Sequence, residues 1–383
     1  MAKPRLETAI PLQIDRSMDP KLAGEFAKQL DASGVVDHIM VWDQLVGWFP
    51  SSLWQPENTP LAAVMADADS FADVFVLGGI TSASSDLGIM VATDCVRRGP
   101  AELTQPMLTL AGATKGKAIL MLGAGEQKQC RPFGYKRAEG LDRMEDFFEI
   151  NKRLTGATAP FDYQGRHTNY RSAYIGQAAT HRPRVHALGG GPRLLEMAAK
   201  YADGYSFAVP CVFSTPEEFH KVATELREDV ERNGRDPDAF EFNAWFVTWI
   251  HEDPEVLERA KQNKLMKWAA AVMGRIDQQK WLAEGIEPAF PVGWHYAVKL
   301  IPTEVTSEDA EAVIERVSPE MVGKAFYQGT PSDIAAQVQG FVDAGLTQAS
   351  IIDYLPTMLP LEEQLTAMAR SVEVCRILKE RNG

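Results

Sequence analysis

The sequence predicts a (β/α)8 barrel, an α/β fold, that carries long insertions. Eight short apolar segments of strand length recur along the 383 residues, and amphipathic helical segments separate most of them. Alternating strands and helices give a parallel sheet, and eight such units are the number that closes a barrel. The alternative is an open doubly wound sheet, which is disfavoured because no G-x-G-x-x-G motif follows the first strand.

The eight predicted strands are short runs of apolar residues bounded by polar residues, glycine or proline. In chain order they are 7–12, 38–41, 87–92, 118–122, 185–188, 204–209, 240–250 and 348–353.

Start and stop signals predict several of the intervening helices. Pro20 precedes a helix over 21–32, which Gly34 ends, and Pro100 precedes a helix over 101–114. Thr215-Pro216-Glu217-Glu218 and Thr330-Pro331-Ser332-Asp333 each place a capping hydroxyl, a first-turn proline and an acid in order.

Three stretches exceed the usual length of a loop, namely 44–67, 156–184 and 274–319. The first and third are rich in aromatic residues, including Trp48, Phe49, Trp54 and Trp294. We interpret the first as a functional cover, because it follows the end of a barrel strand at which active sites lie, while packing on the barrel exterior is the alternative. The chain is expected to be one barrel domain over 1–383.

Composition excludes several classes of protein. Hydrophobic residues make up 45% and charged residues 24%, as in globular proteins. The net charge of −13 disfavours binding to nucleic acids and to anionic membranes. No apolar run has the length of a membrane span, and no signal peptide is evident, so a cytoplasmic location is expected. The cysteines Cys95, Cys130, Cys211 and Cys375 are far apart, which supports neither a disulfide framework nor a metal site.

Polar residues follow the predicted strands at the end where barrel enzymes keep their active sites. Asp43 and Gln44 follow the second strand, with Trp48 shortly after, and Thr93 follows the third. Asp43 and Gln44 are candidates for hydrogen bonds to a heterocycle or substrate, and Trp48 for a wall of the site. A loop-capping aspartate beside a packed tryptophan is the alternative.

Two glycine-rich turns follow the fourth and fifth strands. In Gly123-Ala124-Gly125-Glu126 the glycines allow close approach of a ligand, and a partly desolvated Glu126 is a candidate for proton transfer. Gly189, Gly190 and Gly191 precede Pro192 and a helix, where backbone amides bind phosphate well. A solvated glutamate and a plain flexible turn are the alternatives.

These segments, in this order, resemble the luciferase-like flavin and deazaflavin oxidoreductases. Further resembling stretches are 120–135, 190–204, 233–237 and 329–331. The similarity covers nearly the whole chain and looks closest to the branch that uses coenzyme F420, which includes a glucose-6-phosphate dehydrogenase and a phthiodiolone ketoreductase. The resemblance implies a (β/α)8 barrel, hydride transfer and, commonly, a homodimer.

By position, the resemblance places several residues at the cofactor. It implies contacts from Asp43, Thr93, Glu126 and Gln129, and a phosphate-binding turn at Gly189, Gly190 and Gly191. Trp48 matches a tryptophan over the reacting face, and Glu126 matches an active-site glutamate. Met90 and Val91 fall where the family has a non-proline cis peptide bond behind the ring.

One position departs from the family pattern. The family usually has Asp-His after the second strand, whereas this chain has Asp43-Gln44. Glutamine supplies no proton at neutral pH, so we assign proton transfer to Glu126. His295 and His186 are alternatives, although a lone histidine is more often structural.

The leading hypothesis is therefore an F420-dependent reductase or dehydrogenase. Its small-molecule substrate is expected to be an apolar or lipid-like carbonyl or alcohol, because tryptophans gather near the strand ends and the basic 181–184 segment precedes a strand. The nearest alternative is an FMN-dependent monooxygenase of the same family. A non-catalytic barrel that binds a cofactor and a sugar-phosphate enzyme without a redox cofactor are further alternatives.

Overall fold

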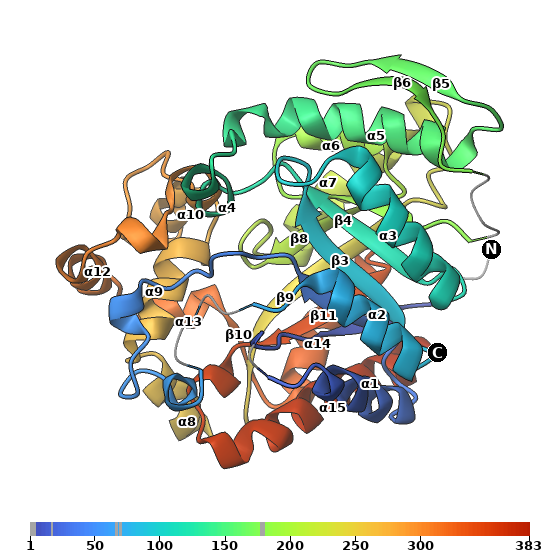
Figure 1. Cartoon of the computed structure of the whole chain (residues 1–383). Helices are drawn as coiled ribbons and strands as arrows, with labels where there is room; N and C mark the ends of the chain where they lie inside the picture. The colour runs from blue at the N-terminus through green and yellow to red at the C-terminus, as the bar shows by residue number, and fades with distance from the viewer. Residues whose placement is uncertain (1–4, 17, 66–67, 69–70, 177–180) are drawn as a thin grey trace.

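A closed barrel of parallel strands forms the centre of the chain in a computed structural model, which describes residues 5–16, 18–65, 68, 71–176 and 181–383 (Figure 1). Within these residues, eight strands pair in the order β1-β2-β3-β4-β7-β8-β9-β11, and β11 pairs with β1 to close the ring. A short strand, β10 (Tyr327–Gly329), adds to the outside of β9. The barrel strands are β1 (Glu7–Pro11), β2 (His38–Trp42), β3 (Gly88–Asp94), β4 (Ala118–Gly123), β7 (Arg184–Leu188), β8 (Gly204–Val209), β9 (Glu241–Ile250) and β11 (Gln348–Asp353). All eight lie where the sequence predicted a strand, so the predicted (β/α)8 barrel is confirmed.

A helix packs outside the barrel after each of these strands. These helices are α1 (Lys21–Ala32), α2 (Val74–Ser84), α3 (Pro100–Ala113), α5 (Gly140–Gly156), α6 (Pro192–Tyr201), α7 (Pro216–Arg232), α14 (Pro331–Asp343) and α15 (Gln364–Asn382). The outward side chains of the strands and the inner faces of the helices share one large apolar core. None of the helices in the described part of the chain has the length and apolar character needed to cross a membrane.

The predicted helix starts are confirmed, and side-chain capping contacts are present at α7 and α14. Helix α1 has the predicted bounds, and Gly34 follows it with a φ of 67°. The Thr215 hydroxyl accepts a hydrogen bond from the Glu218 amide, and Thr330 and Asp333 form a reciprocal capping box. Local sequence therefore fixes these helix starts.

The three predicted insertions contain short elements rather than plain loops. The first holds two 3-10 turns, Ser51–Leu53 and Pro60–Ala63, and the second holds a hairpin that packs on α5 (Figure 1). Residues 66–67 and 177–180 of these insertions lie outside the described residues. The remaining short α-helices and strands, inside and outside these insertions, are α4 (Gln127–Cys130), β5 (Phe161–Gln164), β6 (Asn169–Ala173), α8 (Pro254–Ala260), α9 (Lys264–Met273), α10 (Gln278–Ala283), α11 (Tyr296–Lys299), α12 (Ser307–Ile314) and α13 (Pro319–Ala325).

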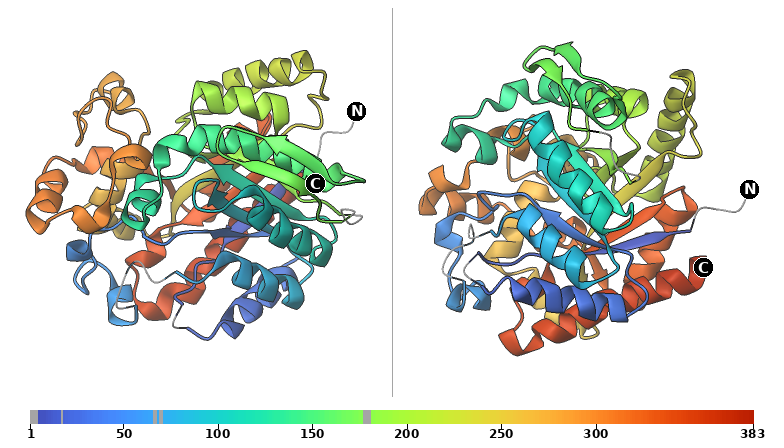
Figure 2. Two further views of the ribbon diagram at one scale, coloured as in Figure 1. Left: turned by 45° about the horizontal axis from the view of Figure 1, so that its top comes forward. Right: turned by 45° about the vertical axis from the view of Figure 1, so that its right-hand side comes forward.

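The first and third insertions share a second apolar core. Leu53, Trp268 and Trp281 are fully buried in it, together with side chains from α12 and α13. Both views in Figure 2 show these helices gathered on one side of the barrel. Two segments far apart in the chain therefore form one structural layer beside the barrel.

The barrel interior is charged at its N-terminal end. Arg184 pairs with both Glu7, at 3.2 Å, and Glu241, through a short hydrogen bond. His38 Nε2 lies 3.1 Å from Glu7 Oε2, and His186 Nε2 lies 2.9 Å from Glu241 Oε2. Barrel interiors are usually filled by branched apolar residues, so this network is a departure that the sequence did not predict.

The two carboxylates of this network are held in their charged form. The Gln348 amide donates to Glu7 at 2.9 Å and to Glu241 at 3.0 Å. Burial alone raises the pKa of each glutamate, but the hydrogen bonds and charges of the histidines and Arg184 bring both pKa values below their ordinary range.

Two glycines make room for the histidines of the network. A Cβ atom on Gly88 would lie 2.1 Å from His38 Nδ1, and one on Gly204 would lie 2.7 Å from both His186 Nε2 and the Glu241 carbonyl oxygen. Real Cβ atoms do not approach so closely. Glycine is therefore required at the start of β3 and of β8 for a steric reason.

Candidate active site

Aromatic side chains line the inside of the barrel at the C-terminal ends of its strands. Trp42 of β2 and Trp245 of β9 point inward and meet edge to face, with ring centroids 6.2 Å apart. Together with Leu188 and Tyr354 they pack on the buried inner layer that includes Met90, and all four are partly exposed. We call Trp42, Trp245, Tyr354 and the neighbouring Leu188 together the aromatic wall. Its position matches the end at which barrel enzymes keep their active sites.

The Glu126 carboxylate is close enough to Tyr354 of this wall for its charge to act on the phenol. The turn from β4 passes through Gly125, which has a φ of 85°, and leaves Glu126 at the start of α4 with its side chain 25% exposed. Burial, and then the negative charge of Glu126, raise the pKa of Tyr354 to about 12, and the same two causes raise the pKa of Tyr296. Both phenols are therefore neutral at pH 7, and Glu126 is the predicted site residue that brings charge to the wall.

Lys128 is the direct partner of Glu126, and the sequence analysis did not identify it. Its side chain is 1% exposed, and its ammonium lies 3.0 Å from Glu126 Oε2. The ammonium also donates to the Val46 carbonyl oxygen at 2.8 Å and lies 4.4 Å from the centroid of the Trp48 ring. A lysine two residues after a candidate acid was a signal in the sequence, but nothing local indicated that it would be buried.

Gln129 fastens the loop that follows β2. Its side-chain oxygen accepts hydrogen bonds from the Leu45 and Val46 amides at 2.7 and 3.2 Å, and its nitrogen donates to the Val46 carbonyl oxygen at 2.7 Å. If Gln129 also contacts the cofactor, as predicted, its side-chain amide must bind the loop and the cofactor at the same time. Helix α4 therefore positions the loop between Gln44 and Trp48.

Trp48 lies between α4 and the third insertion. Its ring meets Tyr296 at 4.8 Å between centroids, and its carbonyl oxygen accepts a hydrogen bond from Trp268 at 2.8 Å. The other aromatics of the predicted cover pack in the second core: Phe49 lies on Trp54, and Trp294 stacks on Phe290 at 3.7 Å. Trp48 packs against the same core as these side chains, and the interpretation of the loop as a functional cover stays a prediction.

Asp43 is held in a buried cluster of charges. One of its carboxylate oxygens accepts hydrogen bonds from Thr93 at 2.6 Å and from Arg98 at 2.7 Å, and lies 3.3 Å from Arg97. Burial raises the pKa of Asp43, but the hydrogen bond from Arg98, the charge of Arg97 and the hydrogen bond from Thr93 lower it overall. Asp43 and Thr93, which were both predicted to contact the cofactor, are therefore hydrogen-bonded to each other. Gln44 follows them and is half-buried.

The predicted cis peptide bond at Met90 and Val91 is wrong. Among the described residues the cis peptide bond lies at Val209–Pro210. Met90 and Val91 lie in the middle of β3 and are paired in regular register with β2 and β4 on both sides, which requires extended trans backbone. Met90 points into the barrel interior, while Val91 points outward into the core beneath the helices.

The glycine turn after β7 leaves room at its tip. Gly189 has a φ of 139°, and its carbonyl oxygen accepts a hydrogen bond from the Tyr205 hydroxyl at 2.6 Å. A Cβ atom on Gly190 would lie 3.1 Å from Val212, whereas no atom lies within 4 Å of one on Gly191. Gly191 is the N-cap of α6, without a side-chain cap, so the backbone here is suited to bind an anion.

The two alternative histidines occupy different ends of the barrel. His186 belongs to the N-terminal network and is fully buried, which excludes it from the aromatic wall. His295 caps α11 by accepting the Ala297 amide at 3.1 Å, and burial and the charge of Arg137 lower its pKa. Arg137 also donates to the Gly125 carbonyl oxygen at 3.0 Å.

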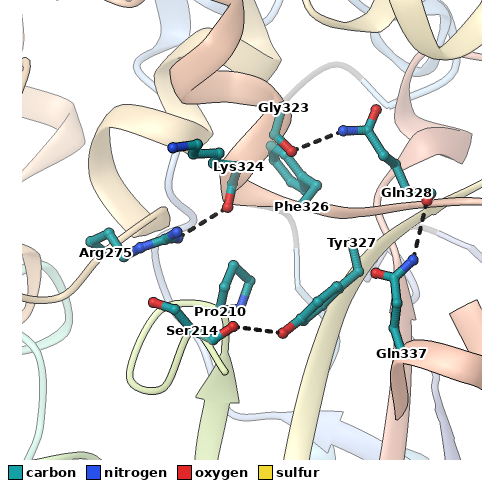
Figure 3. A pocket seen from close by; sticks show the side chains of 9 residues that line it. All are labelled: Pro210, Ser214, Arg275, Gly323, Lys324, Phe326, Tyr327, Gln328 and Gln337. Carbon is teal, nitrogen blue, oxygen red and sulfur yellow. Dashed lines mark hydrogen bonds between the residues drawn. The ribbon is translucent and has the colours of Figure 1, made fainter. Parts of the chain in front are cut away.

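A cavity of about 260 Å³ lies outside the barrel, between the end of β8 and β10 (Figure 3). Figure 3 shows that its polar groups largely bind one another: Arg275 donates to the Lys324 carbonyl oxygen at 3.0 Å, and Tyr327 donates to that of Ser214 at 3.0 Å. None of the predicted site residues lines this cavity. We therefore place the candidate active site at the aromatic wall.

Known proteins similar to this chain point to one family. The family model described as luciferase-like monooxygenase matches residues 10–348. A phthiodiolone/phenolphthiodiolone dimycocerosates ketoreductase from Mycobacterium kansasii is 26% identical over 360 residues, which cover 90% of this chain and 94% of the relative.

Two solved structures share the fold over nearly the whole chain. An F420-dependent secondary alcohol dehydrogenase in complex with an F420-acetone adduct has a TM-score of 0.71 at 14% identity, covering 98% of this chain and 99% of that one. A riboflavin lyase with modified FMN and riboflavin has a TM-score of 0.69 at 13% identity, covering 98% and 92%. At such identities these similarities establish the barrel architecture.

Proposed function

Because the chain belongs to the luciferase-like monooxygenase family, we propose that it is an F420-dependent oxidoreductase. In this proposal hydride passes between the deazaflavin and a carbonyl or alcohol carbon of an apolar, lipid-like substrate. The family membership makes the chain an enzyme of a redox family, and the named relatives support the choice of F420. The ketoreductase and the alcohol dehydrogenase act on the two ends of one interconversion, between a ketone and a secondary alcohol.

The observation that carries the proposal is the Glu126 carboxylate beside the aromatic wall. A ketone that becomes an alcohol must gain a proton on oxygen as well as a hydride on carbon. Glu126 is partly exposed and lies beside the neutral phenols of Tyr296 and Tyr354. A carboxylate in such a position exchanges a proton with a substrate oxygen.

The chain's own groups fit a flavin-type cofactor. The glycine turn at 189–191 offers backbone amides at the start of α6 and open space at Gly191 for a phosphate. Trp245 Nε1 is buried without a hydrogen-bond partner among the described residues, at the edge of the aromatic wall. When bound, the deazaflavin would supply the hydride-carrying carbon.

The remaining roles follow from where each side chain lies. Trp42 and Trp245 would hold a planar ring by stacking and exclude water from the reacting carbon. Trp48, fixed between Lys128 and Tyr296, would close one side of the site. Glu126 would hold or release the proton at its carboxylate oxygen. Asp43, Thr93, Gln44 and Gln129 would shape the loop that carries Trp48.

The apolar substrate is supported by the pairing of several basic side chains, among the described residues, with acidic groups of the protein. Arg184, the last residue of the basic 181–184 segment, is bound to the network at the opposite end of the barrel. Arg97 and Arg98 are paired with Asp43 and Asp94 or Asp73. Lys128 is occupied by Glu126. A doubly charged phosphate on the substrate therefore has no obvious partner among these groups.

Cofactor binding tests the proposal directly. Purified protein is titrated with F420 and with FMN while intrinsic tryptophan fluorescence is followed, and reduced F420 is then offered with aliphatic ketones of increasing chain length. Tight binding of F420, with turnover that improves with chain length, is the expected result. Turnover confined to sugar phosphates would contradict the apolar substrate.

An FMN-dependent monooxygenase is the second candidate function. It is favoured by the name of the matched family and by the fold shared with a lyase that holds modified FMN. Preferential binding of FMN, together with oxygen consumption in the presence of reduced FMN, would replace the first proposal with this one.

A further inference from the structure

We propose that Lys128 is a positioning residue that holds the Glu126 carboxylate in place and joins it to the loop bearing Val46 and Trp48. The inference rests on the proposed function only because that function assigns proton exchange to Glu126. Lys128 need not touch the substrate or the cofactor in this role.

The burial of Lys128 requires an explanation. An ammonium withdrawn from water costs several kcal/mol unless its charge and its N–H groups find partners. Lys128 lies on the four-residue helix α4, and its side chain is 1% exposed. The fold therefore keeps this side chain away from solvent. Contacts with Glu126, Val46 and Trp48 contribute to this compensation.

The contacts differ in kind, and together they orient the carboxylate. Glu126 supplies the opposite charge at 3.0 Å, and the Val46 carbonyl oxygen supplies a hydrogen-bond acceptor at 2.8 Å. Trp48 supplies the face of its ring at 4.4 Å from the ammonium. Because one ammonium binds all three, the position of the loop and the orientation of the Glu126 carboxylate depend on each other.

The thiol and the phenols near Glu126 are neutral, and Arg137 is a second cation in this region. Burial raises the pKa of Cys130 on the same helix to about 12, with a smaller contribution from the charge of Asp94. Tyr296 from α11 and Tyr354 after β11 are also kept protonated by burial and by Glu126. Arg137 binds the Gly125 carbonyl oxygen, one residue before Glu126. Lys128 is thus the cation in direct contact with the carboxylate.

A carboxyl titration tests this role without any cofactor. Protein labelled with ¹³C at the glutamate carboxyl groups is titrated by NMR, and the Glu126 resonance is identified by its loss in Glu126→Gln. Replacing Lys128 by Met should move the Glu126 midpoint upward by about one pH unit or more, because a cation in contact favours the charged form. Lys128→Arg, which keeps the charge, should restore a midpoint near that of the native chain.

An unchanged midpoint in Lys128→Met would overturn the proposal. If that variant does not fold, the coupling is measured from the other side in Glu126→Gln, whose substitution lies at a partly exposed position. There the ¹³Cε resonance of Lys128 should titrate at lower pH than in the native chain, since coupling between two sites is reciprocal. An unshifted Lys128 resonance would overturn the proposal equally.

The outcome is distinguishable from failure of the proposed function. If the native chain turns over no substrate but the NMR midpoints shift as expected, Lys128 holds Glu126 and the proposed activity is wrong. If the native chain is active, Lys128→Met should also shift the acid side of the pH profile of kcat, with Lys128→Arg close to the native profile. Loss of kcat at an unshifted pH profile would assign Lys128 a packing role only.

Discussion

At the N-terminal end of the barrel the inward side chains are charged and amide groups that bind one another, whereas at the C-terminal end partly exposed aromatic rings lie near the Glu126–Lys128 pair. Both ends bury charge. At the first end, Arg184 and Gln348 each bind both glutamates. At the second end, Glu126 has one direct charged partner among the described residues and is open to solvent over a quarter of its side chain.

The difference separates charged groups that stabilise the fold from a charged group that is available for chemistry. A network whose members saturate each other has no group left for a ligand and resists rearrangement, so it specifies the fold. A carboxylate with a single charged partner, beside an apolar wall, keeps lone pairs for a substrate proton. We therefore expect substitutions at the N-terminal end to change stability and those at the C-terminal end to change turnover.

The largest expected effect is on turnover, in Glu126→Gln. Glutamine keeps the size of the side chain but neither accepts nor releases the proton, so kcat should fall roughly 10²–10⁴-fold. Affinity for F420, measured by fluorescence titration, should change far less. The matched control is Glu25→Gln on α1, where the exposed pair with Lys28 has no expected role in turnover. Equal kcat in Glu126→Gln and the native chain would remove Glu126 from proton transfer.

Glu241→Gln should have the largest effect on stability. It removes one of the two carboxylate partners of Arg184 and the carboxylate partner of His186 at a site where Glu241 is only 22% exposed, so the free energy of unfolding should fall by about 3 kcal/mol. Denaturation by urea measures this change, with Glu25→Gln again as the control, for which the expected loss is below about 1 kcal/mol. A loss of kcat in the folded Glu241→Gln variant would contradict the division between the two ends.

Gly204→Ala should destabilise the chain by about 1–3 kcal/mol, because the new methyl group would overlap His186 and the Glu241 carbonyl oxygen. Gly79→Ala is the matched control: Gly79 is exposed within α2, with no atom within 4 Å of the added methyl group, and alanine there should stabilise the helix slightly. Thermal unfolding of the two variants should therefore shift in opposite directions, and a shift of the same sign would argue against the steric requirement at Gly204.

The smallest expected effect is the acid dependence of stability. The pKa values of Glu7 and Glu241 are lower in the folded chain than the roughly 4.3 of an unfolded glutamate. Their contribution is therefore complete above about pH 4.3 and is lost as the pH falls toward the folded values. Urea midpoints between pH 7 and pH 3.5 should fall less steeply in Glu241→Gln than in the native chain. Parallel curves would show that this carboxylate does not contribute to the acid loss.

Much of the barrel could be predicted because its signals are local. Strand β8 has the predicted bounds, as do α1 and β11, since each is a short run whose apolar period and flanking turn residues are adjacent in the chain. The position of Glu126 at a strand end was also predictable, because glycines precede it after the fourth apolar run.

Other features depended on residues that are distant in the chain. Lys128 meets Val46 across 82 positions, and no sequence pattern indicated that the two would touch. Gln129 and Asp43 were predicted to contact a cofactor, but Gln129 binds the Val46 loop and Asp43 binds Arg97 and Arg98. Single-sequence patterns show the type of a side chain and not its partner.

The sequence by itself therefore determined the number, type and order of the barrel elements, because hydrophobic period and capping residues act over a few positions. Only the tertiary structure decided that Trp54 and Trp294 pack in a second core, and that Glu7, Glu241 and Arg184 bind one another. Closing the barrel brings strands β1, β7 and β9 around one axis, so the partners of an inward side chain are set by the register of the whole ring.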